Sequence, residues 1–124
     1  MKVCIIGGGQ SGLVTCKTFV EQGYDVVVLE KSRYNGMYYK IQEKDYFKWS
    51  SSKYVSGFSD FPIPDDYPIW MKIWDYIQYL ESYKQHNQLD RYIQYNTKVV
   101  NCKPLQNSWQ VDYIHDGRKG SYVV

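Results

Sequence analysis

The sequence predicts an α/β fold in which a parallel sheet is followed by a β-meander. Three observations lead to this prediction: a glycine-rich turn between an apolar strand and a helix, a second apolar strand that ends at an acid, and a run of short strand patterns near the C-terminal end. The length of 124 residues is typical of one domain with a single core. We therefore expect residues 1–124 to belong to one domain.

The N-terminal third has the pattern strand, turn, helix, strand. Lys2–Ile6 is an apolar strand, and the glycine turn Gly7–Gly12 follows it directly. A helix is expected from about Ser11 to Gln22, and Gly23 is suited to the C′ position that ends it. The apolar run Val26–Leu29 is typical of a parallel strand that is covered on both faces.

This arrangement is the strong form of the dinucleotide-binding fingerprint, because Glu30 follows Gly12 by eighteen residues. Gly7 would allow the tight turn, Gly9 would let the backbone approach a pyrophosphate, and Gly12 would let the helix pack against the strand. The helix N-terminus supplies N–H groups for the phosphates. Glu30 would accept hydrogen bonds from a ribose diol and repel a 2′-phosphate. We predict an ADP-binding unit; the alternative is a glycine-rich turn in another βαβ unit.

The middle of the chain consists of a long irregular segment and a helix. Residues 31–69 are rich in Tyr, Ser and Lys and then in Pro, without a sustained period, which is typical of a functional excursion. Residues 70–85 have helical spacing. Their apolar stripe, which we expect to be core, consists of Trp70, Ile73, Trp74, Ile77 and Leu80.

The C-terminal part, residues 91–124, predicts a third strand and then a meander. Arg91–Thr97 is the expected third strand. Three shorter strands are expected at Lys98–Cys102, Trp109–His115 and Lys119–Val124, and Asp116-Gly117 is a turn signal between the last two. A meander after the third strand is the crossover of one large class of FAD-binding Rossmann domains.

The composition excludes several other classes of protein. A formal charge of +2 is too small to argue for nucleic acid or an anionic membrane as partner. No apolar run approaches the ~20 residues that span a bilayer. Cys4, Cys16 and Cys102 form no C-x-x-C pair, which favours reduced thiols in a cytoplasmic protein. No metal-ligand cluster stands out, and the isolated histidines His86 and His115 are expected to be structural.

The chain resembles the N-terminal part of the flavin-containing monooxygenases over essentially its whole length. Gly7–Leu13 is similar to the family's G-x-G-x-S-G-L, Asn35–Tyr38 sits at its Gly-Gly-Leu-Trp, and Ser50–Lys53 sits at its Asn-Thr/Ser-Ser-Lys. Phe58–Pro68 is close to F-x-D-F-P-x-P-x-x-x-P and is the most specific stretch. Its prolines preset an extended path that generic Rossmann proteins have no reason to carry.

The resemblance implies an NADPH-dependent flavin monooxygenase. NADPH would reduce FAD, and the reduced flavin would take up O2 as a C4a-hydroperoxide that oxygenates a soft nitrogen or sulfur nucleophile of a small molecule. The cofactor would carry the chemistry, and the protein would bind, orient and exclude water. The cofactor contacts implied for this chain are Gly7, Gly8, Gly9, Gln10, Ser11, Gly12, Glu30, Met37, Tyr38, Ser50 and Ser51.

The resemblance also assigns roles within this set. The glycine turn would wrap the FAD pyrophosphate, and Glu30 would bind the adenosine ribose. Met37 and Tyr38 would lie along the flavin side, with simple packing as the alternative. Ser50 and Ser51 would reach the isoalloxazine and the nicotinamide half of NADPH, with a polar loop as the alternative. The catalytic residue is not assigned; Ser50 replaces the family's flavin-proximal Asn and loses an amide donor.

In the family the chain continues past the meander with a strand that completes the FAD domain and with an NADPH-binding domain. This sequence ends at Val124 with neither, so we expect a Rossmann-like FAD-binding domain that is incomplete at its C-terminus. The first strand would then have an open edge, which predicts self-association or completion by another chain. The isolated chain is expected not to turn over.

Alternatives to the monooxygenase remain open. The chain could belong to another FAD-dependent oxidoreductase that shares the FAD half, such as a Baeyer–Villiger-type enzyme, an oxidase or a reductase. It could also be non-catalytic, either a truncated remnant or a dinucleotide-binding interaction module. A simple NAD-dependent dehydrogenase ranks last, because the Pro-rich excursion has no place in it.

Overall fold

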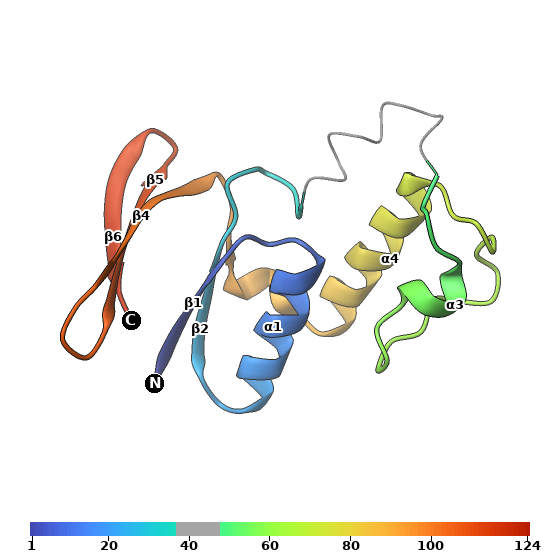
Figure 1. The fold of residues 1–124 in the computed structure, drawn as a ribbon, viewed down its shortest axis with the longest axis horizontal. Helices are drawn as coiled ribbons and strands as arrows, with labels where there is room; N and C mark the ends of the chain where they lie inside the picture. The colour runs from blue at the N-terminus through green and yellow to red at the C-terminus, as the bar shows by residue number, and fades with distance from the viewer. Residues whose placement is uncertain (37–47) are drawn as a thin grey trace. The chain divides into compact units, whose positions relative to one another are not determined.

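The computed structural model describes residues 1–36 and 48–124, which divide into two compact units. The first unit consists of residues 1–36 and 89–124, and the second lies within residues 37–88. The ribbon in Figure 1 runs from the blue strand–helix–strand segment at the N-terminus to the red meander at the C-terminus. Both of these ends belong to the first unit.

The first unit begins with a βαβ motif. Its elements are β1 (Lys2–Ile6), α1 (Gln10–Glu21) and β2 (Asp25–Leu29). The two strands are parallel and in register from Lys2↔Asp25 to Ile6↔Leu29, and α1 lies alongside them (Figure 1). The predicted strands and helix are confirmed to within a residue or two at each end.

The end of α1 is the glycine cap that the sequence predicts. Gly23 has a φ of 80°, and its N–H donates to the carbonyl of Val20 at 3.0 Å. The N–H of Tyr24 donates to the carbonyl of Phe19 at 3.1 Å. This pair of bonds is the Schellman arrangement, and glycine adopts the left-handed conformation that it needs without a steric penalty.

The predicted strand Arg91–Thr97 is wrong in most of its length. Residues Leu89–Tyr92 form the 3-10 helix η1, and β3 is only Ile93–Gln94, parallel to β2. The chain cannot stay extended because Asn96 is left-handed, with a φ of 52°. There its N–H donates to the carbonyl of Ser32 at 3.1 Å. Bonds to the end of β2 and the turn after it thus replace a longer sheet ladder.

The parallel sheet has the order β1-β2-β3. In the part of the chain that the structure describes, β1 pairs with β2 alone, so its other edge carries no strand. The open edge that the sequence predicts is therefore present among these residues. Pairing of that edge with another chain stays a prediction.

The meander is an antiparallel sheet of β4 (Thr97–Pro104), β5 (Trp109–His115) and β6 (Arg118–Val123), in that order. All three predicted strands are confirmed to within two residues. Asp116 and Gly117 join β5 to β6 with φ angles of 45° and 80°. Two successive left-handed residues are the signature of a type I′ hairpin turn, as the Asp-Gly pair predicts.

The core of the first unit is formed by α1, β2 and their neighbours. Its apolar side chains are buried to 9% exposure or less: Ile5, Leu13, Cys16, Val26, Val28, Leu29, Leu89 and Val111. Leu13 and Cys16 lie one turn apart on α1, which gives the helix a single apolar face. This core supports the carboxyl ends of β1 and β2, where the glycine turn begins.

The second unit contains α3 (Lys53–Ser56) and α4 (Ile73–His86). The long helix begins three residues later than predicted, because Lys72 is its extended N-cap residue. The N–H of Lys72 donates to the Asp75 carboxylate at 2.8 Å. An acid at the third helical position is favoured because it satisfies an N–H that the helix leaves unpaired.

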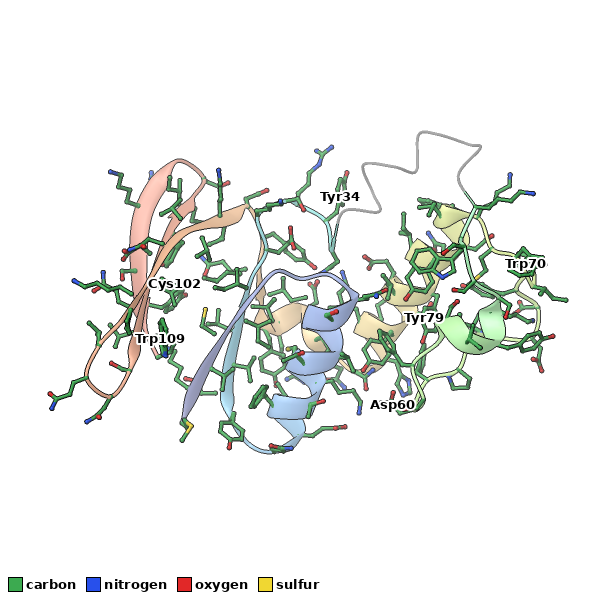
Figure 2. The ribbon with its side chains drawn as sticks, in the orientation of Figure 1. Tyr34, Asp60, Trp70, Tyr79, Cys102 and Trp109 are labelled. Atoms are coloured by element: carbon green, nitrogen blue, oxygen red, sulfur yellow. The ribbon has the colours of Figure 1, made fainter. Side chains whose placement is uncertain are left out.

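The predicted apolar stripe is wrong at both tryptophans. Trp70 is 61% exposed and lies before the helix, so the helical spacing does not apply to it (Figure 2). Trp74 is 52% exposed because it shares its helix face with Gln78 and Glu81. Tyrosines take their place on the buried face, which consists of Ile73, Tyr76, Ile77, Tyr79, Leu80 and Tyr83.

Tyr79 fixes the proline-rich segment to α4 (Figure 2). Its hydroxyl accepts the N–H of Phe58 at 2.7 Å and donates to the carbonyl of Phe61 at 2.6 Å. The ring of Phe58 also packs on Tyr83 with centroids 4.4 Å apart. Burial raises the pKa of the Tyr79 hydroxyl above 10.0, which keeps it protonated as a donor.

Replacing Tyr79 with Phe should lower the free energy of unfolding by about 1–3 kcal/mol, because the partly buried Phe58 N–H and Phe61 carbonyl lose their shared partner. Urea unfolding followed by circular dichroism measures the change. Tyr54→Phe is the matched control, since the Tyr54 side chain is 72% exposed. Equal effects of the two substitutions would contradict a role for the buried hydroxyl.

Cys16 should make the fold sensitive to alkaline pH. Burial raises the pKa of its thiol from 9.0 to about 11. As the pH rises, the Cys16 thiol therefore ionises in the unfolded chain before it ionises in the folded one. Its contribution to the free energy of unfolding is fully present below pH 9 and is lost as the pH rises from 9 through 11. The free energy of unfolding of wild type should fall by about 1 kcal/mol more than that of Cys16→Ala between pH 7.5 and pH 10. An identical pH dependence of the two proteins would refute this assignment.

Candidate functional site

The glycine turn is held by two close backbone contacts. Gly7 has a φ of 98°, and its N–H donates to the carbonyl of Leu29 at 2.9 Å, which ties the turn to β2. A Cβ on Gly12 would lie 2.0 Å from the Gly7 carbonyl oxygen and 3.7 Å from Ile5 Cγ2. The first turn of α1 therefore packs mainly on the turn itself and secondarily on β1, and only glycine fits at residue 12.

The N-terminus of α1 is open to an anion. Gly9 is its N-cap residue, no side chain caps the helix, and its first turn contains no acid. Among the residues that the structure describes, a Cβ on Gly9 would meet only the Cα of Gly36, at 3.8 Å. Gln10 and Ser11 form the first turn, half-buried and exposed respectively. The backbone here leaves room for a group of the size and charge of a phosphate.

Glu30 lies beside the glycine turn, as the fingerprint predicts, but its carboxylate already has protein partners. The side chain is 4% exposed. Its Oε2 accepts the Gly8 N–H at 2.7 Å, and its Oε1 accepts the N–H and the hydroxyl of Ser32 at 2.9 and 2.6 Å. A ribose hydroxyl would have to share or displace one of these bonds. The ribose contact of Glu30 stays a prediction.

A cleft of about 320 Å³ opens at the carboxyl ends of β1 and β2. Its volume lies within the range of about 300–1,000 Å³ that is common for small-molecule sites. It is lined by Ile6, Gly7, Leu29, Glu30, Lys31, Thr97, Lys98 and Val99. The two lysines are exposed and add positive charge beside the glycine turn, which favours an anionic ligand.

Sequence reasoning missed the meander side of this cleft. Thr97–Val99 carries no binding motif, and its place opposite Gly7 depends on the bond from the Thr97 N–H to the Glu30 carbonyl at 2.8 Å. Lys31 could have been noticed as the residue that follows the fingerprint acid. No local pattern in the sequence indicates Lys98.

Asn35 is a further residue that the sequence did not assign. It is 3% exposed, and its Nδ2 donates to the carbonyl of Gly8 at 2.8 Å. Gly36, which follows Asn35, is left-handed with a φ of 78°. Met37 and Tyr38, the predicted flavin-side contacts, lie outside the described residues.

Ser50 and Ser51 belong to the second unit. Ser50 is exposed, whereas the hydroxyl of Ser51 lies 2.8 Å from the hydroxyl of Ser56. The Ser56 oxygen also accepts the indole N–H of Trp49 at 3.0 Å. Both predicted serines lie on the segment before α3, and Ser51 is bonded to that helix through Ser56. Their approach to a flavin stays a prediction.

Lys53 connects the serine segment to the proline-rich stretch. Its side chain is buried, and Nζ donates to the carbonyls of Asp65 and Tyr67 at 2.7 and 2.8 Å and to that of Pro64 at 3.4 Å. A buried ammonium is tolerated only with such partners. The bonds explain physically why the serine–lysine and Phe-Pro stretches of the resemblance occur together.

Residues 1–36 and 48–124 show the features of neither a metal centre nor a membrane-spanning helix. These residues contain no group of three or more His, Cys, Asp or Glu side chains that could hold a metal ion. None of the helices formed by them has both the length and the apolar character needed to cross a bilayer.

Comparisons with known proteins agree with this geometry. Residues 1–124 match the family model described as flavin-binding monooxygenase-like. Flavin-containing monooxygenase 5 of Cavia porcellus is 33% identical over 131 residues, which cover 94% of this chain and 25% of the relative. The chain spans about a quarter of the length of the curated relatives that it matches.

Two solved structures show the same fold. S-allyl-L-cysteine S-oxygenase from Allium sativum is similar with a TM-score of 0.86 at 20% identity, over 98% of this chain and 34% of that one. Bacillithiol disulfide reductase Bdr from Bacillus cereus has a TM-score of 0.84 at 20% identity, over 99% and 37%. At this identity the likeness supports the Rossmann-like α/β fold and not a particular reaction.

The two glycines around the start of α1 should respond differently to a methyl group. Gly12→Ala should lower the free energy of unfolding by about 3 kcal/mol, because its Cβ collides with a backbone carbonyl. Gly9→Ala should cost less than about 1 kcal/mol, since its φ of −73° suits alanine and its Cβ has space. Denaturant unfolding of both variants measures the difference. If Gly12→Ala lost less free energy of unfolding than Gly9→Ala, the packing described for Gly12 would be contradicted.

Proposed function

We propose a function from one premise: the chain belongs to the flavin-binding monooxygenase-like family, whose model it matches over residues 1–124. On this basis residues 1–124 form the FAD-binding part of an NADPH-dependent flavin monooxygenase. The observation that carries the proposal is the uncapped N-terminus of α1, which opens beside the cleft at Glu30. A pyrophosphate and an adenosine need such neighbouring sites.

The residues present suit the ADP half of FAD. The backbone of the glycine turn, Gln10 and Ser11 would face the pyrophosphate, because Gly9 offers the space that a Cβ would otherwise fill. The cleft beside it would take the adenosine, with Glu30 at the ribose. Lys31 and Lys98 at the cleft would favour the net negative charge of the ligand.

The flavin half is proposed to contact Met37 and Tyr38 and the serine segment of the second unit. Lys53 and Tyr79 support that segment by holding the proline-rich stretch next to it. Once reduced by NADPH, bound FAD would activate O2 for oxygenation of a soft nitrogen or sulfur nucleophile in a small molecule. The exposed hydroxyl of Ser50 is the candidate for the flavin-proximal contact.

Turnover would need more than these residues. The sequence contains one G-x-G-x-x-G, which we assign to FAD, so we place NADPH binding outside residues 1–124. The open edge of β1 would accept a further strand, supplied by more of the same protein or by a second copy. The 124 residues alone are expected to bind FAD without catalysing oxygenation.

A second candidate is another FAD-dependent oxidoreductase, such as a reductase or a Baeyer–Villiger-type enzyme. Ser50 favours this candidate, because its side chain is shorter than the Asn of the monooxygenase family at the flavin-proximal position and carries no amide donor. The similar fold of bacillithiol disulfide reductase is compatible with it. Both candidates need the same FAD site, so FAD binding tests their shared premise.

FAD titration of the purified apo chain tests the proposal. We expect saturable quenching of flavin fluorescence near one FAD per chain, and binding to FMN weaker by at least about tenfold, because FMN lacks the ADP half. Gly9→Ala, which should keep its fold, is expected to weaken FAD binding by about tenfold or more. Equal affinities for FAD and FMN, or unchanged binding by Gly9→Ala, would refute the assignment of the glycine turn.

A further inference from the structure

Side chains from outside the glycine turn hold Gly8 on both sides. Gly8 is buried; its N–H donates to Glu30 Oε2 at 2.7 Å and its carbonyl accepts from Asn35 Nδ2 at 2.8 Å. Both of these side chains are themselves at least 96% buried. Because buried backbone groups require partners, these two bonds set the orientation of the peptide planes before and after Gly8.

Asn35 is in turn oriented by Tyr95. The Tyr95 hydroxyl donates to Asn35 Oδ1 at 2.7 Å, although the two residues are 60 positions apart in the chain. The amide can therefore satisfy both neighbours in one orientation only, with its NH2 toward the Gly8 carbonyl and its oxygen toward the hydroxyl. We call this chain of bonds, Gly8–Asn35–Tyr95, the loop relay.

The Tyr95 hydroxyl has a second acceptor nearby. Asp90 Oδ1 lies 2.9 Å from the same oxygen. One hydroxyl proton serves two acceptors, so the bond to Asn35 is shared with an exposed carboxylate. The relay thus ends at the Tyr95 hydroxyl, which also contacts Asp90 of η1, the element that precedes β3.

Packing reinforces the relay. A Cβ on Gly8 would lie 2.9 Å from Asn35 Nδ2 and 3.2 Å from Glu30 Cβ, so these side chains rest directly on the turn. The neighbouring Gly36 reaches within 3.8 Å of the Cβ position of Gly9. The turn at Asn35-Gly36 therefore lies along the glycine turn and restricts its alternative conformations.

We propose that Asn35 and Tyr95 are positioning residues for the dinucleotide. Through the loop relay they hold the glycine turn in the conformation that presents Gly9 and the N-terminus of α1 to the pyrophosphate. A turn that is ordered before binding loses less entropy when the ligand arrives, so the relay raises affinity without touching the cofactor. This inference rests on the proposed function in one respect, the identity of the ligand as FAD.

The test compares Asn35→Ala and Tyr95→Phe with Tyr92→Phe in the 124-residue chain. Tyr92→Phe removes a hydroxyl from the adjacent η1, outside the relay. The first measurement, without ligand, is amide hydrogen exchange within residues 7–12, followed at Gly7 and Gly8, whose N–H groups bond to Leu29 and Glu30. Both relay variants should exchange about tenfold faster there than wild type, and Tyr92→Phe should not.

The second measurement is the FAD dissociation constant, taken at a temperature where circular dichroism shows each variant folded. Both relay variants should bind FAD about tenfold more weakly, and the double variant should lose less than the product of the two single losses. A purely structural role would lower the melting temperature and leave the affinity of the folded protein unchanged. Tyr95→Phe retains the ring, so it serves the test even if Asn35→Ala does not fold.

The outcomes separate the two proposals. Wild-type protein that exchanges slowly at residues 7–12 but binds no FAD would overturn the proposed function. Unchanged exchange in both relay variants would overturn the relay itself. Faster exchange with unaltered FAD affinity would overturn the positioning role and leave the relay as a stabilising contact only.

Discussion

The first unit depends on the hydrogen bonds made by the buried acid Glu30. Its carboxylate accepts bonds from the glycine turn and from Ser32. Its backbone N–H and carbonyl bond to Gln94 at the end of β3 and to Thr97 at the start of β4. A buried carboxylate is costly without donors, so the glycine turn must bring the Gly8 N–H to it. The backbone bonds of Glu30 bring the end of β3 and the start of β4 to the same place. The cleft exists where they converge.

In the second unit, hydrogen bonds from two buried side chains, the Lys53 ammonium and the Tyr79 hydroxyl, likewise hold an irregular segment in place. Pro62, Pro64 and Pro68 each remove a backbone donor from the proline-rich segment. Lys53 bonds to backbone carbonyls of this segment, and Tyr79 bonds to the Phe58 N–H and the Phe61 carbonyl. An irregular segment thereby gains a defined conformation without regular secondary structure. In the proposed enzyme this stiffness would orient the serines that precede α3.

The two errors of prediction have different causes. The strand expected at Arg91–Thr97 is shortened, because hydrogen bonds to the turn after β2 outweigh the β propensity of the segment. The stripe at Trp70 and Trp74 assumed one continuous helix, but Lys72 caps the helix after Trp70. A contact distant in the chain decided the first result, and the local cap formed by Lys72 and Asp75 decided the second. The meander strands and α1, whose patterns depend on neighbours along the chain, were predicted to within two residues.

By itself the sequence determined the βαβ motif, the glycine turn with Glu30 at the adjacent strand end, and the meander. These features follow from local conformational rules: glycine for left-handed or crowded positions, alternating or continuous apolar runs for strands, and Asp-Gly for the hairpin. Only the tertiary structure decided that Asn35 and Tyr95 hold the turn, that Lys98 reaches the cleft, and that Lys53 supports the proline-rich stretch. Such contacts join residues far apart in the chain, and the local periodicity of the sequence does not predict which distant groups will be in contact.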